Sequence, residues 1–384
     1  MKTTIFPIER LKDIPTPFYY YDVELLQQTL ANVTAEAAEG NYRIHFAVKA
    51  NNNPRILGLI AQAGIGADCV SGGEIRMAIE AGIPASKIVY AGVGKDDWEI
   101  ELALDQRIFC INVESAAEMK VINQIATKKN TIAPIALRIN PDIDAHTHEK
   151  ISTGRRGNKF GIEIGLITDA LELVNECDNL RLTGIHAHIG SQITKLDVFK
   201  ALAERFNDLQ DVFDDEGLPL QHINLGGGLG IDYKKPENNM PDFASYFDIF
   251  RKNLEVRPQQ SVHFELGRSV VAQCGTLIAK TIYVKEGETR NFAVVNAGFN
   301  DLVRPAMYGA WHHIENITSD RPAEAYDVVG PICESADIFG AERNINAIAR
   351  GDLIAIRSAG AYGEVMASQY NGRPLPKAYF SDSL

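Results

Sequence analysis

The sequence predicts an α/β protein, with a (β/α)8 TIM-type barrel over residues 25–273 and a β-sandwich or barrel-like domain formed by residues 1–24 and 274–384. Two observations lead to this expectation. From residue 43 onward, short runs rich in β-branched residues alternate regularly with helical stretches that open on Pro, Ser or Gly. After about Gly275, short strand-like runs separated by Gly, Pro and Asn replace that alternation.

The first region contains eight expected strands. They cover residues 43–49, 65–70, 88–91, 108–113, 135–139, 182–188, 222–225 and 261–265. Expected helices over 54–63, 73–81, 115–125 and 196–213 are long enough to act as right-handed crossovers between parallel strands. Eight such units close naturally into a barrel, and an open doubly wound sheet is the alternative that periodicity alone leaves open.

The second region is expected to form strands at 276–284, 292–296 and 352–357. A further strand-like run, 18–21, follows Pro15 and Pro17 and precedes the barrel pattern. We therefore expect this N-terminal strand to join the C-terminal sheet.

Composition indicates a globular chain that acts on a small molecule. Of 384 residues, 45% are hydrophobic and 23% are charged, which is typical of a packed domain. The net charge of −12 disfavours nucleic acid and anionic membranes as partners. Five scattered cysteines without a CxxC pair suggest neither a zinc site nor a disulfide framework, and no apolar run reaches 18 residues, so we expect a cytoplasmic protein.

Reactive residue types cluster at the expected carboxyl ends of the strands, where barrels of this type carry their chemistry. The sequence LGGGLG at 225–230 is the clearest signal, because consecutive glycines let backbone N–H groups approach a phosphate. A tight turn without a ligand is the alternative. A Rossmann motif is excluded, because it would need glycine where the chain has Ile231.

Lys49 lies in the segment HFAVKANNNP, where an apolar strand would bring its amine into the barrel mouth. Burial there would lower the pKa of the amine towards the nucleophilic range, although a lysine that extends to water is the alternative. Together with the glycines and Glu265 at the end of strand eight, Lys49 suggests an imine with pyridoxal 5'-phosphate, whose ring nitrogen Glu265 would keep protonated.

His186 and His188 are two residues apart and are expected on one face of a strand. They could bind a metal together with His146 and His148, as in a barrel hydrolase. Alternatively, one ring lies against a flat cofactor and the other is a hydrogen-bonded supporting group. No HExxH motif or cysteine partner supports the metal, so we favour the cofactor and expect no metal.

Ordered motifs give the chain a family resemblance. They are FAVKAN around Lys49, AHTH at 145–148, HIGSQ at 188–192, GGGLG at 226–230, ELGR at 265–268, RPAMYGA at 304–310, GPICESAD at 330–337 and AGAYG at 359–363. In this order they resemble the fold-type III pyridoxal-phosphate decarboxylases, related to alanine racemase, and most closely the branch that acts on diaminopimelate. The resemblance covers nearly the whole chain.

The resemblance implies a role for each site residue. The cofactor would be held by Lys49, Asp68, His188, Ser191, Gly226, Gly227, Gly228, Glu265, Gly267 and Tyr362. The substrate would be held by Arg268, Arg304, Tyr308, Glu334 and Tyr362, with Cys333 as the proton donor. In this family Cys333 and Glu334 would enter from the second subunit of a homodimer, so a monomer should be inactive.

The charges favour meso-diaminopimelate, which carries an amino acid at both ends. Arg268 and Arg304 offer forked donors suited to a distal carboxylate, and the bare ammonium tail of ornithine or lysine would fit them poorly. The chain is shorter than is usual and has Ala336 where the family has glycine, so carboxynorspermidine decarboxylation is the alternative within the class. A metal-dependent barrel hydrolase and a non-catalytic carrier of pyridoxal phosphate are the alternatives outside it.

Overall fold

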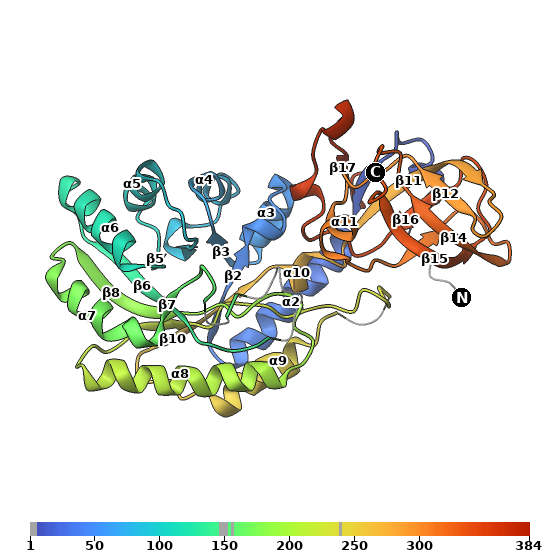
Figure 1. The fold of residues 1–384 in the computed structure, drawn as a ribbon. Coiled ribbons are helices and arrows are strands. Elements are labelled where there is room, and N and C mark those ends of the chain that lie inside the picture. The colour runs from blue at the N-terminus through green and yellow to red at the C-terminus, as the bar shows by residue number, and fades with distance from the viewer. Residues whose placement is uncertain (1–5, 146–152, 155–156, 238–239) are drawn as a thin grey trace. The chain divides into compact units, whose positions relative to one another are not determined.

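The structure is a computed structural model that describes residues 6–145, 153–154, 157–237 and 240–384 (Figure 1). The chain forms two compact units. One, the barrel unit, comprises residues 29–231 and 241–270, and the other, the β unit, comprises residues 1–28, 232–240 and 271–384.

The barrel unit is built on eight parallel strands. They are β2 (Tyr42–Ala47), β3 (Gly66–Cys69), β4 (Ile88–Tyr90), β5 (Cys110–Val113), β6 (Ala133–Asn140), β8 (Leu180–His186), β9 (His222–Asn224) and β10 (Ser261–Leu266). Each pairs with its neighbour, β10 pairs with β2, and β5 pairs with β6 across the remaining gap. This closure confirms the predicted barrel and excludes the open sheet. A two-residue strand, β7 (Ile162–Glu163), adds to the end of β6.

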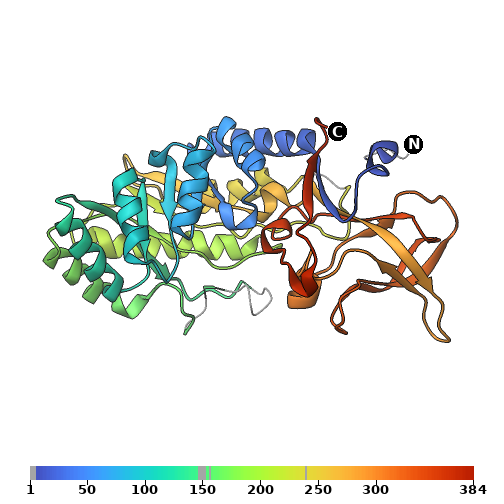
Figure 2. The same cartoon turned by 90° about the horizontal axis from the view of Figure 1, so that it is seen from above.

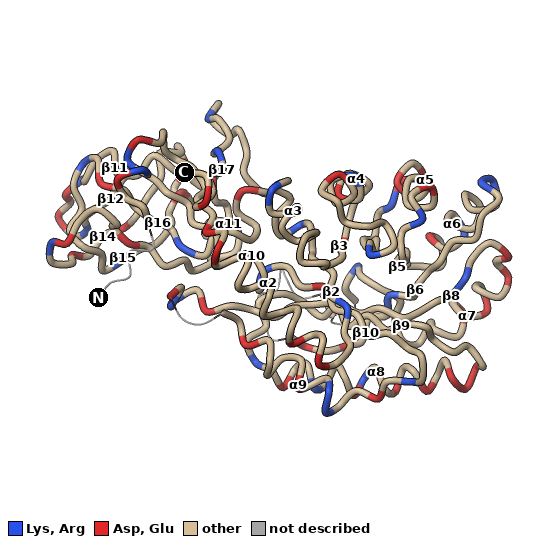
Figure 3. Tube along the Cα trace, turned by 180° about the vertical axis from the view of Figure 1, so that it is seen from behind, with Lys and Arg blue, Asp and Glu red and all other residues tan. Residues whose placement is uncertain are grey.

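Helices cover the outside of the barrel (Figures 1 and 2). They are α3 (Pro54–Gln62), α4 (Gly72–Glu80), α5 (Asp97–Gln106), α6 (Ala116–Lys128), α7 (Ile167–Glu176), α8 (Asp197–Asp215) and α9 (Phe243–Asn253), and α2 (Val23–Glu39) precedes them. Short polar residues begin several helices: the hydroxyls of Ser71 and Ser115 accept from the backbone N–H of Glu74 and Glu118. Acidic and basic residues are interspersed along the outer helices (Figure 3), and no helix in the described part of the chain combines the length and apolarity needed to cross a membrane.

The β unit contains the predicted C-terminal sheet. Its strands are β1 (Phe18–Tyr21), β11 (Gly275–Lys285), β12 (Phe292–Val295), β13 (Ile314–Asn316), β14 (Ala323–Val329), β15 (Ile338–Asn346), β16 (Leu353–Ile356) and β17 (Lys377–Phe380). The main order is β13-β16-β11-β12-β14-β15, and β1 pairs with both β11 and β17. The N-terminal strand therefore joins this sheet, as predicted. Its Phe18 and Tyr20 are buried with Phe6, Leu11 and Ile278.

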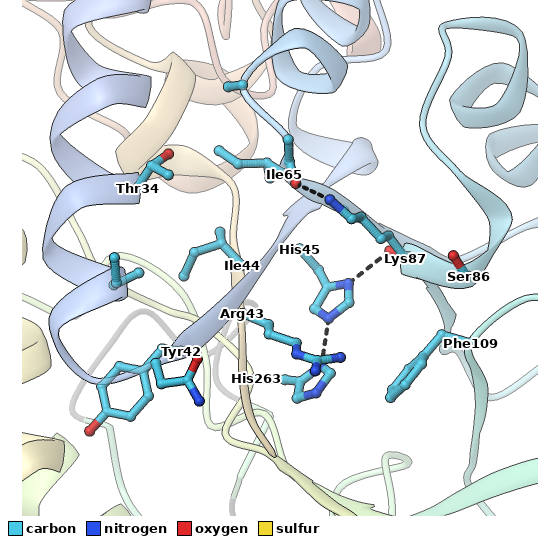
Figure 4. Close-up of a pocket in the computed structure, with 16 residues that line it drawn as sticks. Thr34, Tyr42, Arg43, Ile44, His45, Ile65, Ser86, Lys87, Phe109 and His263 are labelled. Atoms are coloured by element: carbon cyan, nitrogen blue, oxygen red, sulfur yellow. Dashed lines mark hydrogen bonds between the residues drawn. The ribbon is translucent and has the colours of Figure 1, made fainter.

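The barrel interior is polar near the N-terminal ends of its strands. His263 and Glu265 are two residues apart on β10 and so share a face of that strand. His263 is joined to His45 of β2 by a hydrogen bond of 2.7 Å between Nδ1 and Nε2, and His45 Nδ1 lies 3.0 Å from the carbonyl oxygen of Lys87 (Figure 4). Because a carbonyl accepts, His45 Nδ1 is the donor and its Nε2 accepts from His263 when both rings are neutral.

These buried imidazoles predict that the barrel is acid-labile. Burial lowers the pKa of His45 from 6.5 to about 4 and that of His222 to about 3. Between pH 6.5 and pH 4 these imidazoles bind protons in the unfolded chain but not in the folded chain. Their contribution to the free energy of unfolding is therefore complete above pH 6.5 and is lost as the pH falls towards 4. For His45 alone the loss is roughly 3 kcal/mol. We expect the denaturant midpoint of a His45→Gln variant to depend less on pH across this range than that of the parent protein, and equal dependence would contradict this role.

Candidate active site

Lys49 and Asp68 meet where β2 and β3 end. Strand β2 ends at Ala47, and Lys49 lies in a short 3-10 turn, η1 (Val48–Ala50). The prediction that the strand extends to Lys49 was therefore wrong by two residues. The Lys49 Nζ lies 3.8 Å from Asp68 Oδ2, and the side chain of Lys49 is 37% exposed whereas that of Asp68 is 2% exposed. The turn thus keeps the amine accessible beside a buried carboxylate.

Glu265, near the end of β10, is held by donors from three other strands. Its Oε1 accepts from Asn224 Nδ2 at 2.7 Å and from Asn112 Nδ2 at 3.5 Å, and its Oε2 lies 3.0 Å from His186 Nε2. Glu265 is 4% exposed. Burial alone would raise the pKa of Glu265, but the interactions with His186 and the charge of Lys49 lower it below its usual range. The site therefore contains a fixed, buried carboxylate anion.

Asp68 has the opposite electrostatic environment. Burial raises the pKa of Asp68, the charge of Glu265 raises it further, and Lys49 opposes both effects. Its Oδ1 is buried and makes no hydrogen bond within the described part of the chain. Asp68 therefore holds a proton more readily than Glu265 does. The unpartnered Oδ1 of Asp68 could accept a hydrogen bond from a ligand.

His188 lies two residues beyond the end of β8, next to the glycine-rich loop that follows β9. The backbone N–H of Gly227 donates to His188 Nδ1 at 3.1 Å, so the proton of a neutral ring is on Nε2. Burial, with the charges of Lys49 and Arg138, lowers the pKa of His188 well below its usual value. The ring is therefore neutral and can lie against a flat group. His186 is the hydrogen-bonded partner of Glu265, one of the two roles considered for this pair.

The glycines at 226–228 have a packing reason beyond the predicted phosphate loop. A Cβ on Gly226 would lie 2.3 Å from the oxygen of Ala187, and one on Gly227 would lie 1.7 Å from the oxygen of Glu265. Gly226 and Gly228 also have φ values of +66° and +109°. The N–H groups of Gly226 and Gly227 already donate to Asn224 Oδ1 and His188 Nδ1. Close approach of this loop to the segment after β8 and to β10 therefore explains the glycines, and Gly228 keeps an N–H for which the described residues provide no acceptor.

This close approach predicts that Gly227→Ala destabilises the barrel. The clash is with backbone, which cannot move aside like a flexible side chain, so we expect a loss of about 3 kcal/mol or more in unfolding free energy. Gly58→Ala on α3 is the matched control, since no atom lies within 4 Å of its Cβ position and alanine should add about 0.5–1 kcal/mol to the helix. Denaturant unfolding followed by circular dichroism measures both variants. A Gly227→Ala protein as stable as the parent would contradict the packing argument.

Ser191 and Arg268 extend the site beyond the glycines. The Ser191 hydroxyl accepts from Arg268 Nη2 at 3.1 Å and from its Nε at 3.3 Å, and Arg268 is 5% exposed. Gly267 precedes Arg268 and has Ala50 Cβ 3.0 Å from its own Cβ position. Arg268 was predicted to bind the substrate carboxylate. Its contact with Ser191, which is expected to hold the cofactor, instead favours a role in binding the phosphate of that cofactor.

Arg304 of the β unit is held in place by neighbours in the same unit. Its Nη1 donates to His312 Nε2 at 2.8 Å, and His312 Nδ1 donates to the carbonyl of Arg357 at 2.8 Å. The guanidinium also lies 4.8 Å from the ring centre of Tyr233. Arg304 begins α11 (Arg304–Tyr308) and half-buried Tyr308 ends it. Tyr362, also half-buried, follows β16 with a φ of +56°.

Cys333 and Glu334 lie on an exposed but firmly held loop. The carboxylate of buried Asp337 accepts from the N–H of Ile332 and from that of Phe299, both at 2.7 Å. Tyr370 donates to the carboxylate of Glu334. Ala336 is outside the left-handed φ region, so alanine fits where the family has glycine.

The structure therefore gathers one group of predicted residues in each unit. The barrel unit contains Lys49, Asp68, His188, Ser191, Gly226, Gly227, Gly228, Glu265, Gly267 and Arg268, and the β unit contains Arg304, Tyr308, Cys333, Glu334 and Tyr362. Sequence reasoning missed the supporting residues Asn112, Asn224, His312 and Asp337. Asn224 could have been found, because it is two residues after His222 on a strand whose alternate side chains face inward.

The described residues provide no cluster of three or more His, Cys, Asp or Glu side chains arranged to bind a metal ion. His146 and His148, which the hydrolase alternative required, lie outside those residues. The Nε2 atom of His186 is hydrogen-bonded to Glu265.

Comparisons with known proteins identify the family. The family model described as pyridoxal-dependent decarboxylase, pyridoxal binding domain, matches residues 25–272. A diaminopimelate decarboxylase of Bacteroides thetaiotaomicron is 55% identical over 382 residues, 99% of each chain, and one of Haemophilus influenzae is 42% identical over 96% of this chain and 88% of its own. The crystal structure of the Helicobacter pylori diaminopimelate decarboxylase complexed with L-lysine is 38% identical, with a TM-score of 0.90 over 97% of this chain and 93% of its own. This chain therefore belongs to the pyridoxal-dependent decarboxylases, in the group of the diaminopimelate decarboxylases.

Proposed function

We propose that this chain releases carbon dioxide from meso-2,6-diaminopimelate to give L-lysine, with pyridoxal 5'-phosphate as cofactor. The observation that carries the proposal is the accessible Lys49 amine, 3.8 Å from Asp68 and beside the fixed Glu265 carboxylate, in a chain of this family. The L-lysine in the Helicobacter pylori structure is consistent with the proposed product.

The residues of the barrel unit fit this cofactor. Lys49 would hold its aldehyde carbon, Glu265 its ring nitrogen and His188 the face of its ring. Its phosphate would be held by Ser191, Arg268 and the N–H of Gly228. The polar oxygen that Asp68 leaves without a partner agrees with a polar ligand at this position. When bound, pyridoxal phosphate accepts the electron pair that remains when carbon dioxide leaves.

Glu265 and His188 act through their protonation states. Because Asn224 and His186 hold Glu265 as an anion, it can keep a proton on a nitrogen that faces it. His188 stays neutral because Gly227 donates to its Nδ1 and burial disfavours the cation. A neutral ring provides a flat surface and adds no further positive charge beside Glu265.

Arg304 is proposed to fix the far end of the substrate. Its buried guanidinium is oriented by His312 and Tyr233, and its fork matches a carboxylate. Tyr308 and Tyr362 are proposed to take part in the same binding. Holding the far carboxylate orients the bond that breaks, which is the main contribution that positioning makes to the rate.

We further propose that the active enzyme is a homodimer in which Cys333 and Glu334 complete the site of the second subunit. This proposal is supported by the exposure of both side chains on a loop that the hydrogen bonds of Asp337 hold in place. Such a loop can enter another chain without first paying the entropy of becoming ordered. There Cys333 would donate the proton that replaces the carboxylate, and Glu334 would bind the distal ammonium of the substrate.

We also propose that the protein works in the cytoplasm. All five cysteines are free thiols, and Cys333 is exposed. A proton-donating thiol at the surface needs a reducing compartment.

A substrate panel tests the proposed function. Carbon dioxide release is measured in parallel from meso-diaminopimelate, carboxynorspermidine, ornithine and arginine. We expect the first to be preferred by roughly 10⁴-fold or more in kcat/KM over substrates without the distal carboxylate, because they offer no carboxylate to the buried guanidinium fork of Arg304. In an Arg304→Gln variant this preference should shrink. Preference for any other substrate would contradict the assignment.

A further inference from the structure

A second cavity opens at the N-terminal end of the barrel and is not used by the proposed chemistry. Its volume is about 380 Å³ and all its lining residues belong to the barrel unit. Several of them lie at the starts of strands: Tyr42 begins β2, Lys87 precedes β4 and Phe109 precedes β5 (Figure 4). Others, such as Thr34, belong to α2. Lys49 follows the other end of β2, so this cavity is separate from the cofactor site.

The cavity is cationic, although the protein has a net charge of −12. Arg43 and Lys87 line it, and no Asp or Glu does. The Lys87 Nζ donates to the carbonyl of Gly64 at 2.8 Å, so no carboxylate neutralises it there. Within the described part of the chain, the guanidinium of Arg43 makes no ion pair or hydrogen bond. The cavity therefore presents a positive charge that a ligand could neutralise.

Much of the remaining wall is apolar, and the ring nitrogens of its two histidines are already hydrogen-bonded. Phe109 stacks on His263 with ring centres 4.9 Å apart and planes 19° apart. His263 in turn bonds His45, and Ser261 satisfies its second nitrogen at 2.9 Å. The two imidazoles are consequently occupied with each other and with the backbone of Lys87. They form a flat, neutral surface beside Arg43.

We propose that this cavity binds a small organic anion: a carboxylate on an apolar body, paired with Arg43 and packed against Phe109. The volume lies within the range of small-molecule sites. The forked guanidinium favours a carboxylate, and the apolar wall favours an organic molecule over a bare inorganic ion. Because this site is separate from the cofactor site, its occupation does not depend on which substrate the enzyme decarboxylates.

The test uses 4-(trifluoromethyl)benzoate, titrated into the cofactor-loaded enzyme and followed by ¹⁹F NMR. We expect saturable binding that becomes at least about tenfold weaker in Arg43→Gln, the cost of a charge-assisted pair. Ala63→Phe, which fills the cavity but keeps Arg43, should also weaken binding. Arg181→Gln, an exposed arginine near the start of β8, is the matched control and should change affinity by less than about twofold. Carbon dioxide release by each variant shows that it is folded.

Two further ligands define the chemistry of the site. The neutral amide, 4-(trifluoromethyl)benzamide, should bind at least about tenfold more weakly than the carboxylate. Inorganic phosphate should not displace the probe at equal concentration. Absence of saturable binding, equal affinity in Arg43→Gln or Ala63→Phe, equal binding of the amide, or displacement by phosphate would each overturn the proposal. None of these results depends on the substrate panel, so this inference can fail while the proposed function stands.

Discussion

Replacing Lys49 by alanine is expected to reduce carbon dioxide release by about 10⁴-fold or more, the scale of losing a covalent catalytic group. The amine is the accessible nucleophile at this end of the barrel, with Asp68 3.8 Å away and Glu265 fixed nearby. No neighbouring residue can take over its role from the same position, because the amine is set by the η1 turn. Lys200→Ala on α8 is the matched control, since that lysine is exposed and pairs with Glu204 on the same helix.

Borohydride reduction followed by peptide mapping gives this prediction a second measurement. In the parent enzyme the pyridoxyl group should be found on the peptide that contains Lys49, and in Lys49→Ala it should be absent. A modified peptide elsewhere in the chain, or full activity in Lys49→Ala, would contradict the assigned role. The Lys200→Ala enzyme should be labelled and active like the parent.

The sequence predicted the barrel strands closely, because each is a short apolar run bounded by turn residues. All eight expected strands are present, and β10, expected at 261–265, spans Ser261–Leu266. The end of β2 was less predictable: Val48 favours a strand whereas Ala50 favours a helical turn, and the switch to η1 places the Lys49 amine. The local sequence does not distinguish the two conformations.

The site residues were available from motifs. Strand alternation pointed to His186 and Asn224 as further inward-facing groups, but the sequence did not show which site residue each of them holds. Glu265 depends on Asn224 and His186, and Arg304 depends on His312. Asn224 and His186 are 41 and 79 residues from Glu265 in the sequence, so no local pattern shows that they bind its carboxylate. The sequence singled out the triple glycine as a phosphate loop, which stays a prediction. The structure gives Gly227 a packing reason that a motif cannot reveal, because that reason lies in the backbone of β10.

Mixing two inactive variants is expected to restore activity if the site is shared between subunits. Cys333→Ala should reduce carbon dioxide release by about 10²-fold or more, the usual contribution of a positioned proton donor. Lys49→Ala removes the other half of the same chemistry. In a mixed dimer, one site combines the intact Lys49 of one chain with the intact Cys333 of the other, and the second site contains both substitutions.

After random exchange of subunits in equal amounts, half of the dimers are mixed and each has one intact site, so activity should recover to about a quarter of the parent level. A mixture of Lys49→Ala with Lys49→Ala,Cys333→Ala is the control and should stay inactive, because no site can then contain both groups. Recovery should rise with the time allowed for exchange. If a fully exchanged mixture stays inactive, Lys49 and Cys333 must act within one chain, because only a shared site can be repaired by a partner that carries the complementary defect.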